Sequence, residues 1–404
     1  MTRTCLIVGA SHAGSQLAIS LRQEGWDGRI VLLGEERHLP YHRPPLSKEY
    51  LAGRRTANEI HIRPAAVYEK AQIEFLSGRR VERIDRAGRR VILDGGEPLV
   101  YDKLALAVGS RVRHVDLPGV DLPGVHYLRT KADVDRIRAD LCPGGRAVIV
   151  GGGYIGLETA AVLRKLGMEV TVVEMMERVM QRVTAPEVSA FYTRIHTEEG
   201  VRILCGTGVA GFEGAGKVES VRCGDGRILP ANLVIIGVGI VPNIELAREG
   251  GLNVDNGIVV DEHACTSDPD IVAAGDCTWH FNTLYQRWIR LESVQNAGDQ
   301  ARIAAATICG KAQSYNSLPW FWSDQYDLKL QIAGLSQGYD EIVTRGDPDQ
   351  GRSFAAFYLR EGRVIAVDAI NRPPEFMQGK KLIADRKQVE RTRLADAAVP
   401  VWEL

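Results

Sequence analysis

Two glycine-rich segments of the same design, at residues 5–14 and 147–156, constrain the fold of this chain more than any other feature. Each begins with a short apolar run and continues into a loop with small residues at the positions of a dinucleotide-binding fingerprint. In such a loop, glycines let the backbone approach a pyrophosphate, while free N–H groups and the helix dipole face its negative charge. A chain with two such loops most often binds a flavin and a nicotinamide dinucleotide and passes electrons between them.

The first copy has the strand, loop and helix that the fingerprint requires. Residues 15–23 show helical spacing, and a second predicted strand, residues 29–33, leads to Glu35, where a carboxylate usually receives the adenosine ribose hydroxyls. Ser11 replaces the usual middle glycine, which weakens the motif when it is taken alone, and we interpret His12 as structural or as a phosphate neighbour. The expected contacts of this loop are Gly9, Ser11, His12, Ala13 and Gly14.

The second copy fits the pattern without a departure. A predicted helix extends through Leu163, and the strand that follows, residues 169–173, ends at Glu174. A carboxylate at this position accepts hydrogen bonds from a ribose diol and repels a 2′-phosphate, so we predict NADH rather than NADPH. Arg178 lies nearby, but Glu174 and Glu177 dominate the local charge. The expected contacts of this loop are Gly151, Gly153, Tyr154, Ile155 and Gly156.

The length of 404 residues is too great for one ordinary domain. Residues 103–108 indicate a buried strand followed by a crossover, and residues 233–243 indicate the return. After about residue 318 the pattern changes to short alternating segments, typical of a small antiparallel sheet. We therefore predict an α/β chain with a discontinuous Rossmann-like FAD-binding domain (residues 1–108 and 241–317), a Rossmann-like NAD-binding domain (109–240) and a C-terminal α+β domain (318–404).

Charge, hydropathy and cysteine spacing exclude several classes of function. The formal net charge is -1 and the longest apolar stretches are far too short for a bilayer span, so neither nucleic acid nor a membrane is expected as a partner. The N-terminus leads directly into a strand without room for a signal peptide, which predicts a cytoplasmic location. No Cys-x-x-Cys pair occurs, and no cysteine lies between Cys5 and Cys142, so we expect neither a metal site nor a redox disulfide beside the flavin.

Four strings complete a pattern that extends over nearly the whole chain. They are Arg43-Pro44-Pro45-Leu46-Ser47-Lys48, Gly152-Gly153-Tyr154-Ile155-Gly156-Leu157-Glu158, Ala274-Gly275-Asp276-Cys277 and Trp320-Phe321-Trp322-Ser323-Asp324-Gln325. With them the chain resembles the NADH-dependent ferredoxin reductases of the putidaredoxin-reductase type, within the glutathione-reductase-like flavoprotein fold. Ser11 and Val108 depart from the Gly and Thr that are usual in this group.

The resemblance implies a set of contacts with non-covalently bound FAD. Asp276, which the sequence places at the carboxyl end of a strand, would accept a hydrogen bond from the ribityl chain. Val294 would open a helix whose positive end faces the pyrimidine edge of the flavin. One of Trp320 and Trp322, which we take to be Trp322, would line the pocket near the ring. The further contacts implied are Arg43, Pro45, Val81, Arg129 and Gly239.

Three residues are expected to take part in the reaction between the cofactors. Lys48 follows a rigid Pro-Pro pair, and a fixed cation near the flavin favours its anionic reduced form. By resemblance, Glu158 pairs with Lys48 near the nicotinamide, whereas Tyr154 covers the flavin face and moves when the nicotinamide binds. A hydride transfer of this kind needs no general base, in agreement with the lack of a catalytic histidine arrangement in the sequence.

The resemblance also implies a small two-iron, two-sulfur ferredoxin as the electron acceptor, which would supply a haem-thiolate monooxygenase or a ring-hydroxylating oxygenase. Because such ferredoxins are typically acidic, a local basic surface is expected. Arg63 and Arg302 resemble docking positions, and a basic stretch follows at residues 380–393. We expect a monomer or a weak dimer.

Alternative functions stay open at this point. A rubredoxin reductase would use the same chemistry with another iron protein, and an NADH-sensing flavoprotein would signal through its reduced complex. An NADH oxidase or peroxidase requires a cysteine beside the flavin, which does not occur between Cys5 and Cys142. A membrane quinone reductase requires a long amphipathic C-terminal anchor, which the sequence does not show.

Overall fold

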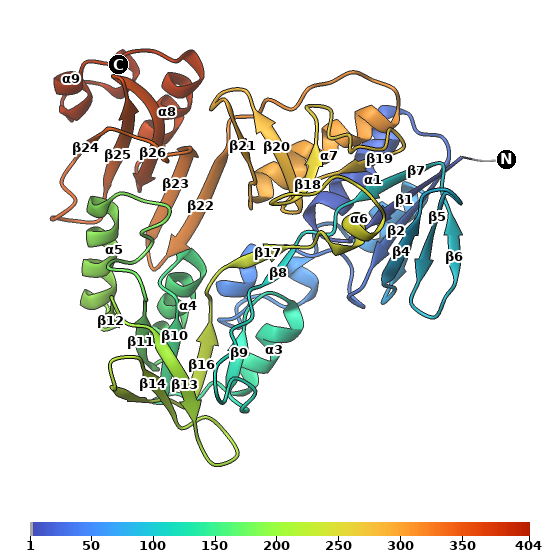
Figure 1. The fold of residues 1–404 in the computed structure, drawn as a ribbon. Coiled ribbons are helices and arrows are strands. Elements are labelled where there is room, and N and C mark those ends of the chain that lie inside the picture. Colours follow the sequence, from blue (N-terminus) through green and yellow to red (C-terminus); the bar gives the residue numbers. More distant parts are fainter. Residues whose placement is uncertain (1–2) are drawn as a thin grey trace. The chain divides into compact units, whose positions relative to one another are not determined.

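The computed structural model of the protein describes residues 3–404 (Figure 1), which form two compact units. Unit 1 comprises the described residues of Met1–His42, Ala57–Arg111 and Ile240–Pro319. Unit 2 comprises Arg43–Thr56, Val112–Gly239 and Trp320–Leu404. The segment Arg43–Thr56, which contains Lys48, therefore packs with unit 2 although residues of unit 1 flank it in the sequence on both sides.

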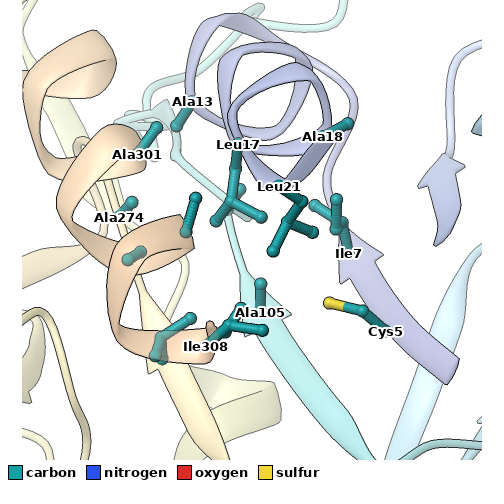
Figure 2. Close-up of a cluster of buried hydrophobic side chains, with 14 of the residues drawn as sticks. Cys5, Ile7, Ala13, Leu17, Ala18, Leu21, Ala105, Ala274, Ala301 and Ile308 are labelled. Carbon is teal, nitrogen blue, oxygen red and sulfur yellow. The ribbon is translucent and has the colours of Figure 1, made fainter. Parts of the chain in front are cut away.

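Unit 1 is built on a parallel five-stranded sheet with the order β19-β7-β1-β2-β3. Its strands are β1 (Thr4–Val8), β2 (Arg29–Gly34), β3 (Ile73–Ser77), β7 (Lys103–Leu106) and β19 (Ile271–Ala273). Ile7 packs under the helices α1 (His12–Glu24) and α7 (Val294–Ile308), and Leu6 joins a cluster on the opposite face. Because both faces of the sheet are buried, the strands are almost continuously apolar. Figure 2 shows the first cluster, in which Leu17 and Leu21 of α1 lie above Ala105 of β7.

The remaining elements of unit 1 are short. They are η2 (Asn58–Ile60), α2 (Ala65–Lys70), β4 (Val81–Asp85), β5 (Arg90–Leu93), β6 (Pro98–Val100), α6 (Glu245–Glu249), β18 (Ile258–Val260), β20 (Thr278–Asn282) and β21 (Arg287–Ile289). Two three-stranded sheets, β4-β5-β6 and β18-β20-β21, are formed from these strands, and β8 (Ser110–Val112) pairs with β17 (Ile240–Pro242).

Unit 2 contains a second parallel five-stranded sheet, with the order β12-β11-β10-β16-β9. Its strands are β9 (Val125–Tyr127), β10 (Arg146–Val150), β11 (Glu169–Val173), β12 (Arg202–Leu204) and β16 (Leu233–Ile236). The helices are η1 (Pro44–Ser47), α3 (Lys131–Ala139), α4 (Tyr154–Lys165) and α5 (Pro186–Glu198), and a small antiparallel sheet is formed by β13 (Val209–Glu213), β14 (Ser220–Cys223) and β15 (Ile228–Pro230). The succession β10-α4-β11 repeats the succession β1-α1-β2 of unit 1.

The C-terminal part of unit 2 is an antiparallel sheet with the order β22-β23-β26-β25-β24 (Figure 1). Its elements are β22 (Trp320–Gln325), β23 (Leu328–Gly334), β24 (Glu341–Arg345), β25 (Phe354–Arg360), β26 (Arg363–Ile370), α8 (Pro373–Asp385), α9 (Arg391–Ala395) and η3 (Val401–Glu403). The predicted fold class, with two Rossmann-like parallel sheets and a C-terminal antiparallel sheet, is confirmed. The three-domain division stays a prediction, because compactness alone groups the C-terminal part with Val112–Gly239. Among residues 3–404, no helix has the length and apolar character needed to span a membrane.

Candidate functional site

The first glycine loop has a geometry that only glycine permits at two positions. Gly9 follows β1 with φ +109°, and a Cβ there would lie 2.1 Å from the carbonyl oxygen of Ala107. A Cβ on Gly14 would lie 1.8 Å from the carbonyl oxygen of Gly9, because α1 starts so close to the end of β1. The Ser11 side chain makes no capping hydrogen bond with α1. The loop therefore fits a pyrophosphate at the N-terminus of α1.

Two further predicted residues flank this loop within unit 1. The Nε2 atom of His12 lies 3.3 Å from Nδ1 of His42, and Ala13 is buried. Glu35 follows β2 with an exposed carboxylate, 3.7 Å from Nη1 of Arg80. The position of Glu35 at the carboxyl end of a strand is the one expected for a ribose-binding carboxylate, and that role stays a prediction.

Asp276 lies just beyond β19 and is held by its neighbours. Its Oδ2 atom accepts a hydrogen bond of 2.8 Å from the Ser110 hydroxyl. The preceding turn is fixed by the side-chain oxygen of Gln300, which accepts a hydrogen bond of 2.9 Å from the N–H of Gly275. The carboxylate thus stands at the carboxyl edge of the unit 1 sheet, where open α/β sheets bind their ligands.

The predicted helix start at Val294 is confirmed. Ser293 is the N-cap of α7, and its hydroxyl accepts a hydrogen bond from the N–H of Asn296. The positive end of the α7 dipole therefore lies at Val294, which suits an electron-rich ring. Val81 is a core residue of unit 1 with 8% of its surface exposed, and its contact with FAD stays a prediction.

In the second glycine loop, as in the first, two glycines lie where a side chain would clash with a backbone carbonyl oxygen. A Cβ on Gly151 would lie 2.3 Å from the carbonyl oxygen of Gly237, and a Cβ on Gly156 would lie 2.1 Å from that of Gly151. Gly153, the N-cap of α4, differs from both, because nothing lies within 4 Å of its Cβ position. The space in front of Gly153 is therefore open, as the close approach of a pyrophosphate requires. Ile155 follows with an exposed side chain.

Glu174 ties this loop to the strand that follows it. Its Oε2 atom accepts a hydrogen bond of 2.6 Å from the N–H of Gly152, and Oε1 accepts one of 2.8 Å from the N–H of Met176. A carboxylate has about four acceptor positions, so it retains capacity for a ribose hydroxyl. The guanidinium of Arg178 points into its own loop and donates to the carbonyl oxygens of Thr184 (2.9 Å) and Gln181 (3.2 Å).

Lys48 and Glu158 form a buried ion pair, as the resemblance implied. The Nζ atom of Lys48 lies 2.6 Å from Oε2 of Glu158, and the side chains are 11% and 1% exposed. Lys48 follows η1, whose Pro44 and Pro45 fix the backbone, and Glu158 lies on the first turns of α4. Burying a carboxylate is costly unless it is paired and hydrogen-bonded, so the surroundings of Glu158 must supply further donors.

Two serines supply them, and sequence reasoning did not select either. The Ser47 hydroxyl donates to Oε2 of Glu158 at 2.6 Å, and the Ser323 hydroxyl donates to Oε1 at 2.7 Å. Both belong to strings that support the family resemblance, and this is the one signal in the sequence that points to them. Three chain segments of unit 2, namely η1, α4 and β22, therefore meet at a single carboxylate.

Aromatic side chains surround the start of α4. The ring of Tyr154 lies 5.0 Å from that of Phe321, and its hydroxyl is buried without a hydrogen-bond partner among the described residues. Burial raises the pKa of Tyr154 well above its ordinary value, so this hydroxyl stays protonated. Trp322 lies next to Trp320 in β22, at a ring distance of 5.6 Å. These contacts place Tyr154 in unit 2, and its motion on nicotinamide binding stays a prediction.

The other predicted FAD contacts in unit 2 have structural partners of their own. Nη1 of Arg43 donates to the carbonyl oxygen of Arg129 at 2.8 Å, and Pro45 is buried in η1. Gly239 has φ +103° and an exposed backbone, and its carbonyl oxygen accepts a hydrogen bond from the N–H of Arg113. Their contact with FAD stays a prediction.

The candidate docking arginines are both engaged in contacts within unit 1. Arg63 donates to the side-chain oxygens of Ser15 (3.1 Å) and Gln16 (2.9 Å). Arg302 is 57% exposed and pairs with Asp299 one turn earlier on α7. The ion pair of Arg302 is exposed, and such pairs are weak and easily exchanged. The docking role of both arginines stays a prediction.

All seven cysteines are free thiols. Cys277 directly follows the predicted flavin contact Asp276 in the sequence, and its side chain is completely buried. Burial raises the pKa of Cys277 to about 12, so its thiol stays protonated and unreactive.

Comparison with known proteins decides the family. Residues 3–301 match the family model described as pyridine nucleotide-disulphide oxidoreductase, and residues 320–404 match the model described as reductase C-terminal. The chain belongs to the pyridine nucleotide-disulphide oxidoreductase family. The family resemblance and the enzyme class predicted from the motifs are confirmed.

Full-length relatives have the same organisation. The chain is 48% identical to putidaredoxin reductase CamA of Pseudomonas putida, over 99% of this chain and 96% of that protein. It is 45% identical to the 5,5′-dehydrodivanillate O-demethylase ferredoxin reductase subunit of Sphingobium sp. (strain NBRC 103272 / SYK-6), over 99% of this chain and 98% of that one. A chain of the solved covalent putidaredoxin reductase–putidaredoxin complex is 48% identical to this chain, with a TM-score of 0.96. The match covers 99% of this chain and 97% of that chain.

Proposed function

We propose that the protein is an FAD-dependent NADH:ferredoxin oxidoreductase. FAD is bound by the first glycine loop and Asp276, and NADH by the second glycine loop and Glu174. The electron acceptor is a two-iron, two-sulfur ferredoxin, which supplies a haem-thiolate monooxygenase or a ring-hydroxylating oxygenase. The observation that carries the proposal is the match to reductases of this kind over 99% of the chain. The two loops that fit pyrophosphates support it.

The cofactors supply the redox chemistry, since bound FAD accepts a hydride from NADH and releases its electrons one at a time. The protein supplies position and charge. The N-termini of α1 and α4 hold the two pyrophosphates, and the α7 N-terminus and Asp276 orient the flavin. The Lys48–Glu158 pair is one to two turns into α4 from Gly153, and the family resemblance implies that the nicotinamide would lie near it. Cys277, the cysteine that follows Asp276, is buried with a protonated thiol, so it would not relay electrons from the flavin.

The coenzyme of this reaction is NADH rather than NADPH. Two backbone N–H groups hold the Glu174 carboxylate, which retains acceptor capacity for a ribose hydroxyl. Arg178, the cation that would otherwise favour a 2′-phosphate, is engaged with Thr184 and Gln181. The local charge therefore favours a ribose diol over a phosphate.

The partner is recognised by a basic surface that includes Arg63 and Arg302. Ferredoxins of this kind are acidic, and complementary charge mainly raises the rate of encounter. A cytoplasmic location and a monomer or weak dimer complete the proposal.

The experiment that tests the function is NADH-dependent cytochrome c reduction by the FAD-loaded protein, with and without candidate ferredoxins. Strong stimulation by a two-iron, two-sulfur ferredoxin supports the proposal. Stimulation by a rubredoxin alone identifies a rubredoxin reductase. Slow turnover with every carrier, together with a long-lived reduced complex, identifies an NADH-sensing flavoprotein.

A further inference from the structure

A buried row of polar side chains leads to the Glu158 carboxylate from the C-terminal part of unit 2. The Ser323 hydroxyl lies 2.7 Å from Oε1 of Glu158, and Nε2 of Gln325 donates to that hydroxyl oxygen at 3.2 Å. The Oε1 atom of Gln325 lies 2.8 Å from Nε2 of His196, and the Tyr326 hydroxyl lies 3.2 Å from Nδ1 of the same ring. Ser323, Gln325 and His196 are each at most 1% exposed. Water therefore does not reach the hydrogen bonds that join these three side chains and Glu158.

The protonation state and the donor or acceptor character of each group determine which way the hydrogen bonds of this row run. Burial lowers the pKa of His196 to about 4, so the ring is neutral at ordinary pH and carries one proton. The side-chain oxygen of Gln325 only accepts, so that proton is on Nε2, and Nδ1 accepts from Tyr326. The amide of Gln325 then donates to Ser323, whose hydroxyl proton is directed at Glu158. Every donor in the row points toward the carboxylate, and such polarised chains reinforce each member.

The two oxygens of Glu158 have different partners. Oε2 accepts from both Lys48 and Ser47, whereas the one donor to Oε1 among the described residues is Ser323. If the Ser323 hydroxyl is removed, one oxygen of a buried carboxylate loses its donor. The carboxylate is then free to turn, and the Lys48 ammonium that it holds turns with it.

We propose that Ser323, backed by Gln325 and His196, is a positioning residue for the nicotinamide reaction, because it holds Glu158 in the one orientation that presents Oε2 to Lys48. This inference rests on the proposed function, since it assumes that the nicotinamide end of NADH lies at the Lys48–Glu158 pair. It gives the C-terminal antiparallel sheet a part in the reaction with NADH, in addition to any contact with the electron acceptor.

The test compares NAD⁺ with ADP-ribose, which contains the second pyrophosphate and adenosine but no nicotinamide. Calorimetry with the FAD-loaded Ser323→Ala protein is expected to show NAD⁺ binding about tenfold weaker and ADP-ribose binding unchanged, because one hydrogen bond to a charged group is lost at the nicotinamide end. Flavin reduction by NADH slows by a similar factor. Ser323→Thr, which keeps the hydroxyl, restores both. Ser353→Ala, which removes a serine that directly precedes β25 and donates to the Asn371 carbonyl oxygen, changes neither.

A loss of affinity for both ligands together, or wild-type affinity for both with wild-type flavin reduction, would overturn the inference. A second comparison uses Lys48→Met. If Ser323 acts through Glu158 and Lys48, Ser323→Ala slows flavin reduction much less in the Lys48→Met background than in the wild type, and an undiminished tenfold effect there contradicts the idea. If Ser323→Ala does not fold, Gln325→Met takes its place, because it removes the amide that donates to the Ser323 hydroxyl. Its NAD⁺ affinity, ADP-ribose affinity and rate of flavin reduction are then compared in the same way.

These outcomes are separate from a failure of the proposed function. A protein that binds NAD⁺ and is reduced by NADH, but transfers electrons to no ferredoxin, refutes the proposed acceptor and leaves the Ser323 comparison intact. A protein that transfers electrons to a ferredoxin, but shows the same NAD⁺ affinity and the same rate of flavin reduction with and without the Ser323 hydroxyl, refutes the positioning role alone.

Discussion

Replacement of Glu174 offers a quantitative test of coenzyme choice. In the structure its carboxylate accepts hydrogen bonds from two backbone N–H groups, those of Gly152 and Met176, and it retains acceptor positions for the predicted ribose. A hydrogen bond to a charged group contributes about 1.5–3 kcal/mol, or roughly ten- to a hundredfold in affinity. Glu174→Ala also loses the two hydrogen bonds from backbone N–H groups, which loosens the glycine loop. This loosening weakens the binding of both coenzymes alike, so it cancels when the efficiency with NADH is divided by the efficiency with NADPH.

The ratio of kcat/KM for NADH to kcat/KM for NADPH is therefore expected to fall by roughly ten- to a hundredfold in Glu174→Ala. Steady-state reduction of ferricyanide with each coenzyme measures it without any ferredoxin. Glu177→Ala is the matched control, because this exposed carboxylate lies three residues away, and its removal is expected to change the ratio by less than about threefold. An unchanged ratio in Glu174→Ala, or an equal change in Glu177→Ala, would refute the assignment of the ribose to Glu174.

Three further outcomes are expected. Gly153→Ala is expected to fold normally but to bind NAD⁺ about tenfold more weakly, because its methyl group enters the open space that the pyrophosphate would occupy. Gly156→Ala is expected to disrupt the loop, because its methyl group would clash with the carbonyl oxygen of Gly151. Melting curves measure the stability of each variant, and calorimetry measures its affinity for NAD⁺. Asp368 accepts a 2.5 Å hydrogen bond from Tyr358, and burial raises its pKa to about 7. The protonated form therefore favours the folded state, and the protein loses stability as pH rises from about 4 through 7. The melting temperature of Asp368→Asn should not fall in this way between about pH 5 and 8, and the same fall as in the wild type contradicts the prediction. Higher salt should slow reduction of ferredoxin but hardly affect reduction of ferricyanide, and equal responses would remove the basic docking surface.

The glycine loops were predictable because their sterics are local. At Gly14 and Gly156 the atom that a Cβ would strike is a carbonyl oxygen of the same loop, so a short string contains the requirement. At Gly9 the positive φ is local, whereas the close carbonyl oxygen belongs to Ala107, just beyond the neighbouring strand β7. The same holds for Glu174, whose place after β11 follows from the period of the strand. The pairing of Lys48 with Glu158 came from the family resemblance, since nothing in residues 43–48 by themselves indicates it.

The donors around Glu158 were not predictable in this way. Ser323 meets Glu158 across 165 residues of sequence, and a serine in a strand carries no pattern that names its partner. Arg178 illustrates the same limit, because its charge is visible in the sequence while its engagement with Thr184 depends on how the loop after β11 folds back. Val81 is buried in the hydrophobic core of unit 1, and its contact with the cofactor, implied by resemblance, stays a prediction.

The assembly of unit 2 from three separated stretches limits how such enzymes can be recombined. Exchange of residues 112–239 for the coenzyme-binding region of a distant homologue would deliver a new Glu158 without the lysine of residues 43–56 or the serine of residues 320–404 that hold it. A functional chimera must inherit all three stretches from one parent, or restore the lysine and the serine individually.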